Sequence, residues 1–219
     1  MKIKRTLDLE TLKLLSGAHA SSKAGMCVME AVAFVAGEPH SDHPECASPV
    51  IAQFLRTWND DLDDVGRQRL KPYVLKVVGT RASAEVEDQR GWLCADWMVR
   101  VHTVAWLELG GMKDQADALR ALVPLTSETT LDAALPPLNE ARKRSDAAGA
   151  AAWDAARDAA WDAARDAALA ASWDAARDAS WDAARDAATQ KLEPTKLSLQ
   201  ESAFALLDRM IALGGDQCG

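Results

Sequence analysis

A four-residue repeat between Trp153 and Ala188 constrains the fold more than any other feature of the chain. Trp-Asp-Ala-Ala units alternate with Arg-Asp-Ala-Ala units, and one degenerate unit begins at Leu169. Seventeen of these 36 residues are Ala and none is Gly or Pro, and Ala is the strongest helix former. The repeat therefore predicts one continuous helix of about 54 Å, at about 1.5 Å per residue.

The large side chains of this repeat cannot line one flat face. Four residues advance about 400° on a helix of 3.6 residues per turn, so each unit lies about 40° beyond the last. The repeat is either a helical spacer or a surface for self-association or a protein partner. Stacking of nucleic-acid bases on the indoles is a third possibility, which the eight Asp against four Arg disfavour. The predicted partner-binding residues are Trp153, Arg157, Trp161, Arg165, Trp173, Arg177, Trp181 and Arg185.

The charge and hydropathy of the whole chain narrow the classes of partner. A net charge of -8 over 219 residues disfavours binding to long nucleic acid or to an anionic membrane surface. The longest nearly apolar run, Met26 to Ala36, is much shorter than the roughly 20 residues of a membrane span. The first residues lack the apolar stretch of an export signal, and four cysteines in such a chain are typical of reduced thiols. We expect a cytoplasmic protein.

Helix signals recur through the rest of the sequence, and strand signals hardly appear. Apolar spacing with caps and stops predicts helices at about 9–17, 22–37, 48–62, 72–79, 84–109 and 113–122. The segment 22–37 is apolar nearly all round, which is typical of a central helix. Ser198 to Glu201 fits a capping box that opens a final helix after a break at Pro194.

These signals predict an all-α protein. Residues 1–123 should form an N-terminal helical bundle. Residues 124–138, with three prolines, should form a linker. Residues 139–219 should contain the long repeat helix and a C-terminal amphipathic helix that folds back.

A loop with two histidines and a cysteine is a candidate metal site. His40, His43 and Cys46 are spaced by two residues each, and Zn²⁺ is commonly bound by these residue types, with Cys27 or Cys94 as a fourth ligand. Zinc is thus a possible cofactor. Two other interpretations stay open: a structural loop whose polar groups satisfy helix ends, and a Cys/His nucleophilic pair.

Glu30 lies on the apolar helix, and a buried carboxylate needs a partner. Either it forms a buried ion pair or it faces a pocket. The candidate ion-pair partners are Arg56, Lys76, Arg81, Arg100 and His102. A pocket could take a small nucleotide-like ligand through stacking and phosphate contacts. The candidate ligand-binding residues are Glu30, Trp58, Trp92, Trp97, Arg100 and His102.

Several segments resemble a group of uncharacterised helical proteins from actinobacteria and bacteriophages. They are Cys27-Val-Met-Glu-Ala, Gly37-Glu-Pro-His-Ser-Asp-His-Pro-Glu-Cys46, and the Ala/Trp-rich repeat with the following Leu206-Leu207-Asp208-Arg209. The resemblance implies an accessory or phage-encoded protein that blocks a host protein by contact or sequesters a signalling nucleotide. It implies no catalytic residues.

The function expected from the sequence is non-enzymatic binding of a protein partner or of a second copy of the chain. The chain contains no P-loop, dinucleotide fingerprint, nucleophile elbow or His-Glu-x-x-His motif. The alternatives are a sponge for a small nucleotide-like ligand and a metal-dependent enzyme centred on the His40, His43 and Cys46 loop.

Overall fold

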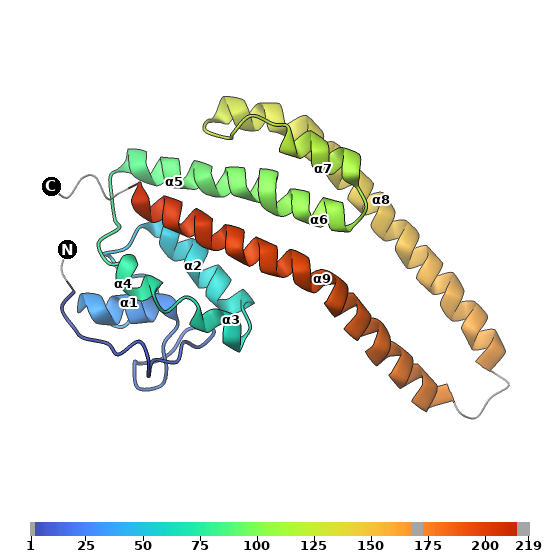
Figure 1. Cartoon of the computed structure of the whole chain (residues 1–219), viewed down its shortest axis with the longest axis horizontal. Coiled ribbons are helices and arrows are strands. Elements are labelled where there is room, and N and C mark those ends of the chain that lie inside the picture. Colours follow the sequence, from blue (N-terminus) through green and yellow to red (C-terminus); the bar gives the residue numbers. More distant parts are fainter. Residues whose placement is uncertain (1–2, 168–172, 214–219) are drawn as a thin grey trace. The chain divides into compact units, whose positions relative to one another are not determined.

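The computed structural model describes residues 3–167 and 173–213, without the side chains of residues 148–167 and 173–190. The chain forms two compact units: the first unit is residues 1–94 with 204–219, and the second unit is residues 95–203. Over the described residues it is helical without a β-strand, which confirms the predicted all-α fold class (Figure 1). None of the described helices is both long and apolar enough to cross a membrane.

Two helices pass from one unit to the other. The first unit contains α1 (Val28–Ala36), α2 (Pro49–Asp61), α3 (Asp64–Gln68), α4 (Tyr73–Lys76), most of α5 (Ala84–Trp97) and the last turns of α9 (Trp173–Ala212). The second unit contains the π-helix η1 (Met98–Thr103), α6 (Val104–Leu109), α7 (Lys113–Arg120), α8 (Glu128–Ala167) and the rest of α9. The units therefore divide within α5 and α9, and not at the predicted linker.

α1 is the central helix of the first unit. All of its residues except Phe34 are buried, and it packs against α2 and α4. Its last turn ends at Gly37, whose φ of 71° is a left-handed conformation that favours glycine. The prediction of a central helix is confirmed, although the helix begins at Val28 because Cys27 provides the N-cap.

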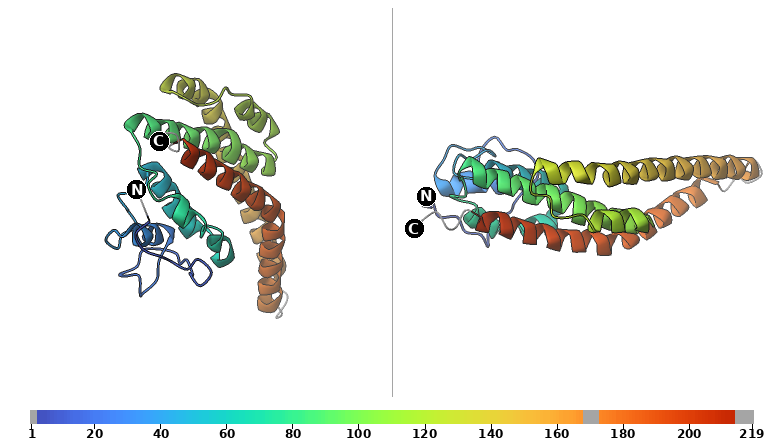
Figure 2. Two further views of the ribbon diagram at one scale, coloured as in Figure 1. Left: turned by 60° about the vertical axis from the view of Figure 1, so that its left-hand side comes forward. Right: turned by 90° about the horizontal axis from the view of Figure 1, so that it is seen from above.

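Residues 3–27 contain no helix, so the helix predicted at 9–17 is wrong. Leu12 and Leu14 are both buried, which is the two-residue alternation of an extended segment. The side chain of Gln68 bonds both the N–H and the C=O of Leu14, each at 3.0 Å. These contacts replace intrahelical hydrogen bonds. In Figure 2 this segment, in dark blue, loops beside α1.

Arg90 is a fully buried cation on α5 that connects distant parts of the first unit. Its Nε donates to the carbonyl oxygen of Met210 at 2.8 Å, and its Nη1 donates to the carbonyl oxygen of Thr80 at 2.7 Å. Nη1 also pairs with the Glu87 carboxylate at 2.8 Å. The guanidinium thus holds the end of α9 against α5 and the turn before α5.

The prolines of the predicted linker lie inside a helix. α8 begins at Glu128 and continues through Pro136 and Pro137, so a linker over 124–138 is a wrong description of these residues. A proline in a helix interior lacks the N–H donor, and its ring crowds the carbonyl four residues before it, at a cost of about 3 kcal/mol. Contacts beyond the helix itself must outweigh this cost.

Two features stabilise the first turns of α8. The Thr130 N–H donates to Ser127 Oγ at 3.4 Å, and the Ser127 N–H donates to Thr130 Oγ1 at 3.0 Å, which caps the helix. Ala134 and Ala141 are buried on α8, which packs against α7. Tertiary packing therefore overrides the helix-breaking signal of the two prolines.

The predicted break at Pro194 is also absent. α9 runs through Pro194 and through the predicted capping box at Ser198 to Ala212 without interruption. Leu206, Leu207 and Met210, on its last turns, are buried in the first unit. The amphipathic C-terminal segment is helical as predicted, but it is the end of a longer helix.

The backbone of the repeat is helical wherever the structure describes it. α8 includes 153–167, and α9 includes 173–188. Residues 168–172 lie outside the described residues, so the continuity of one helix across the whole repeat stays a prediction.

Replacement of Arg90 by Ala should destabilise the first unit strongly. The substitution removes three hydrogen bonds and leaves the Glu87 carboxylate without its buried partner, a loss of about 3–5 kcal/mol in the free energy of unfolding. Urea unfolding followed by circular dichroism measures it. Arg81→Ala, which removes an exposed arginine with a single 3.3 Å bond to a backbone carbonyl, is the control and should change stability by less than about 0.5 kcal/mol. Equal effects of the two variants would contradict the role of Arg90.

Candidate functional site

A buried carboxylate organises the loops before and after α1. Glu30, whose side chain is 2 % exposed, accepts hydrogen bonds from the backbone N–H groups of His19 and Cys27, each at 2.7 Å. Nδ1 of His19 lies 2.8 Å from Oε2, and Nε2 of His40 lies 3.4 Å from Oε1. The Glu30 carboxylate thereby holds the loop before α1, through His19, and the loop after α1, through His40, against the N-terminus of the helix.

The neighbours of these two imidazoles determine which nitrogen carries the proton. Nδ1 of His19 faces a carboxylate, so it is the donor. Nε2 of His40 lies 2.9 Å from the carbonyl oxygen of His19, so it is also the donor. Both rings therefore support the loop conformation through hydrogen bonds that persist in the neutral imidazole.

The ionisation of Glu30 follows from the same contacts. Burial alone would raise the pKa of its carboxyl, but the hydrogen bonds from Cys27 and His19 outweigh burial and hold the pKa below its usual 4.5. Burial, with the Glu30 carboxylate nearby, raises the pKa of the Cys27 thiol to about 12. Burial also raises the pKa of the Cys46 thiol. Thiols of this kind are poor nucleophiles at neutral pH.

The structure gives the predicted metal ligands three different surroundings. His40 bonds the carbonyl oxygen of His19, His43 is exposed and pairs with Asp42 at 2.6 Å, and Cys46 is buried. No group of three or more His, Cys, Asp or Glu side chains in the described part of the chain is arranged to hold a metal ion.

The partner of Glu30 is a histidine that the sequence reasoning missed. The five predicted partners bond elsewhere: Arg56 with the Asp42 carbonyl, Lys76 with Asp208, Arg81 with the Glu45 carbonyl, Arg100 with Asp96 and His102 with Trp106. The need for a partner was correctly predicted, and His19 and His40 supply it from loops. In the structure Cys27 and Glu30 form a capping box at the start of α1, which positions the carboxylate. No sequence pattern indicated His19.

The predicted ligand-binding residues are divided between the two units. Trp58 belongs to the first unit, where its ring packs against Phe54 at 5.5 Å and Phe204 at 4.6 Å between centroids. Trp92 is half-buried on the part of α5 in the same unit. Trp97, Arg100 and His102 belong to the second unit. These three lie in or next to the π-helix.

The π-helix carries a cluster of aromatic rings in the second unit. The His102 ring lies 5.3 Å from Trp97 and 6.2 Å from Trp106, measured between centroids. Nε1 of Trp106 donates to Nε2 of His102 at 3.2 Å, and Nε1 of Trp97 donates to Oγ of Ser202 on α9 at 3.0 Å. The cluster is therefore attached to α9 through Trp97.

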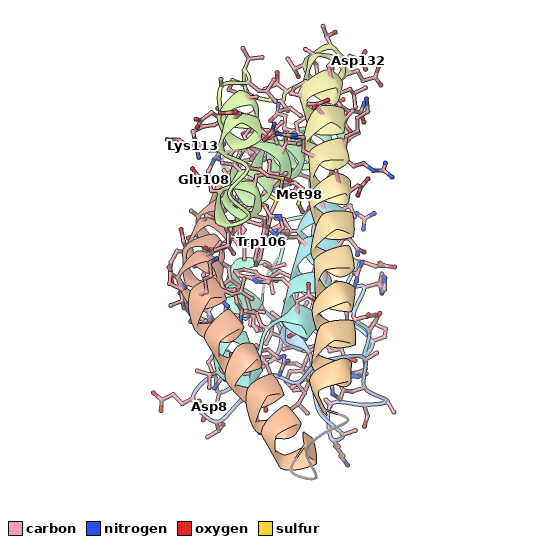
Figure 3. All side chains as sticks on the ribbon, turned by 90° about the vertical axis from the view of Figure 1, so that its right-hand side faces the viewer. Asp8, Met98, Trp106, Glu108, Lys113 and Asp132 are labelled. Carbon is pink, nitrogen blue, oxygen red and sulfur yellow. The ribbon has the colours of Figure 1, made fainter. Side chains whose placement is uncertain are left out.

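The π-helix also aligns apolar side chains that a regular α-helix would spread. Residues eight positions apart in an α-helix point about 80° apart, whereas the wider turn of a π-helix rotates the chain less per residue. Figure 3 labels Met98, the first residue of η1, and Trp106 on α6, which follows η1 directly. We call the row of Met98, His102 and Trp106 the π-helix face.

Two of these side chains are exposed although they are large and apolar. Met98 is 49 % exposed and Trp106 is 37 % exposed. Val99, next to Met98 on the same helix, is by contrast buried. No sequence signal indicated the change from α- to π-helix, which moves Trp106 toward Met98.

Arg100, a predicted ligand contact, has a structural partner beside this face. Its Nη1 lies 3.0 Å from the Asp96 carboxylate, and the same carboxylate oxygen accepts the backbone N–H of Leu125 at 2.9 Å. The pair links η1 to the segment before α8. Exposed Met98 and Trp106 thus lie on the same stretch of helix as a paired Arg100 and Asp96.

The side chains predicted to bind a partner on the repeat lie outside the described residues. This applies to Trp153, Trp161, Trp173 and Trp181 and to the arginines between them.

Comparison of the chain with protein-family models, with curated proteins and with solved structures finds no match in any of the three. The functional argument therefore depends on the geometry of these residues.

Glu30→Gln should destabilise the first unit at pH 7 by about 1–3 kcal/mol. The Gln amide directs a donor at N–H groups that now bond a carboxylate oxygen. Because the pKa of Glu30 is lowered in the folded state, its contribution is complete above the unfolded pKa of about 4.3 and disappears as the pH falls through the lower folded pKa.

Urea unfolding of wild type and Glu30→Gln from pH 7 to pH 3 measures this effect. The difference in the free energy of unfolding should shrink toward the acid end of the series. Glu45→Gln, at an exposed carboxylate in the same region, should match wild type throughout. A difference that grows on acidification would contradict the direction of the Glu30 shift.

Proposed function

We propose that the chain is a non-enzymatic helical binding protein that acts through protein–protein contact, with the π-helix face as a contact surface. The observation that carries the proposal is the exposure of two large apolar side chains, Met98 and Trp106, at the two ends of the π-helical segment and its continuation. Apolar side chains grouped on a surface mark interaction sites more often than single ones do. Trp residues are also enriched among those that dominate binding energy.

The surroundings of the face favour contact over ligand enclosure. Trp97 is fixed by Ser202, and His102 fills the space between the two indoles. A ring already occupies the position that a stacked base would take. The aromatic groups therefore suit a partner that lies on the surface.

A second copy of the chain is the partner that the local charges favour. Asp96 is paired with Arg100, and Arg120 is paired with both Glu108 and Asp117. Two copies with a net charge of -8 repel one another. That repulsion is smallest where charges are neutralised within each copy, as they are around this face.

The repeat supports the same class of function. Its helical backbone and its Ala content allow close approach of another helix. We therefore keep the Trp and Arg positions of the repeat as a proposed second contact, to be tested separately from the π-helix face.

Trp106→Ala and Met98→Ser should weaken self-association. A residue at the centre of an interface contributes about 2 kcal/mol or more, so the dissociation constant should rise about 30-fold for Trp106→Ala. Sedimentation velocity of the full chain over a concentration series measures it, with native mass spectrometry to identify the oligomer. Val65→Ser, at an 81 % exposed valine in the first unit, is the matched control and should leave the dissociation constant unchanged.

A wild-type chain that stays monomeric at every concentration would overturn self-association. An oligomer that Trp106→Ala, Met98→Ser and Val65→Ser leave equally intact would exclude the π-helix face as its interface.

Joint replacement of Trp153, Trp161, Trp173 and Trp181 by Ala tests the repeat in the same assay. We expect the variant to remain helical, because Ala has the highest helix propensity. We also expect it to associate more weakly, so that its oligomer dissociates at a higher protein concentration than the wild-type oligomer. An unchanged oligomer with unchanged circular dichroism would assign the repeat to the role of a spacer.

A further inference from the structure

His102 occupies the middle of the π-helix face, where it accepts a hydrogen bond. Nε1 of Trp106 lies 3.2 Å from Nε2 of His102. An indole N–H is a donor and never an acceptor, so Nε2 must offer a lone pair. Neutral imidazole has one such nitrogen, whereas protonated imidazole donates from both nitrogens. The observed contact therefore requires neutral His102.

The two neighbouring indoles are held differently. Trp97 donates to Ser202 Oγ, and that hydroxyl in turn donates to the carbonyl oxygen of Leu199 at 2.8 Å. This chain is independent of His102. Trp106 directs its N–H to His102 itself, so a change at His102 acts on Trp106 first.

We propose that protonation of His102 is a switch for the π-helix face: neutral His102 holds Trp106 in the row with Met98, and protonated His102 releases it. The proposal deepens the proposed function, on which it rests wherever it concerns assembly. The release of Trp106 itself is a property of the single chain.

The charged groups around His102 do not supply a counter-ion in the described structure. On its own helix, Asp96 pairs with Arg100 and Glu108 pairs with Arg120. From α7, which packs against η1, the charged side chains are Lys113, Asp114, Asp117 and Arg120, and Asp117 is engaged by Arg120. From α9, Glu201 lies beside Ser202 in the sequence and has interactions of its own.

The electrostatics place the switch on the acid side of neutrality. Burial lowers the pKa of His102 below its ordinary value of 6.5. The neutral form, with its bond to Trp106, is therefore complete above about pH 6.5 and is lost as the pH falls through the lowered pKa. The face should be intact at pH 7.5 and should open as the pH falls through that lowered pKa.

The test follows the indole N–H of Trp106 in the ¹⁵N-labelled full chain from pH 7.5 to pH 4.5. Its signal is identified by its loss in Trp106→Phe. We expect the Trp106 shift to titrate with the same midpoint as the His102 ring and to move more than the Trp97 shift, because Trp97 contacts the His102 ring but donates its N–H to Ser202. In His102→Gln the amide oxygen can accept the bond but does not titrate, so the Trp106 shift should become independent of pH.

Two results would overturn the switch. One is a Trp106 shift that stays constant in wild type while the His102 ring titrates. The other is a Trp106 titration that persists in His102→Gln. His43→Gln, at a histidine that is 67 % exposed in the first unit, is the matched control and should keep the wild-type midpoint. If His102→Gln fails to fold, His102→Asn replaces it in the same comparison.

Sedimentation velocity at pH 7.5 and pH 5.5 separates the switch from the proposed function. If the switch and the self-association are both correct, acidification raises the wild-type dissociation constant about tenfold, the effect of roughly one hydrogen bond. The dissociation constant of His102→Gln should not change with pH. A monomer at both pH values with a titrating Trp106 supports the switch and removes the self-association. A pH-independent oligomer with a constant Trp106 supports the association and removes the switch.

Discussion

The guanidinium of Arg90 binds a backbone carbonyl that lies 120 residues away, at Met210, together with the carbonyl of Thr80. A buried cation is stable only with such a set of acceptors and a paired carboxylate, here Glu87. Because the acceptors come from α9 and from the turn before α5, the contact requires the end of the chain to return to the first unit. The last turns of α9 belong to the first unit, where Leu207 is buried.

Glu30 is a second buried charge that is stabilised by several hydrogen-bond partners, here in the irregular residues before α1. A segment without helix or strand leaves its backbone groups unpaired unless side chains satisfy them. The Glu30 carboxylate bonds the N–H groups of His19 and Cys27, and Gln68 bonds both polar groups of Leu14. Buried polar side chains thus take the place of regular structure in this part of the first unit.

The second unit differs from the first in that its irregular element, the π-helix η1, is accompanied by large apolar side chains that are exposed. The π-helix between α5 and α6 brings His102 between two indoles and leaves Met98 and Trp106 on the surface. π-helical turns occur frequently at functional sites. A surface of this composition suits the protein contact that we propose, and the hydrogen bond from Trp106 to His102 is the basis of its proposed sensitivity to protonation.

The sequence by itself determined the helical class, the central α1, the Ser48-capped α2 and the helical backbone of the repeat in its described parts, because caps, apolar periodicity and Ala content act over a few residues. It also required a partner for Glu30. The tertiary structure alone decided which partner that was, because His19 lies in a loop without a periodic signal. It likewise decided that α8 and α9 continue through their prolines and that Trp106 is exposed. Packing between distant segments outweighs local helix-breaking signals, and the insertion of a π-turn leaves no pattern in the residues that form it.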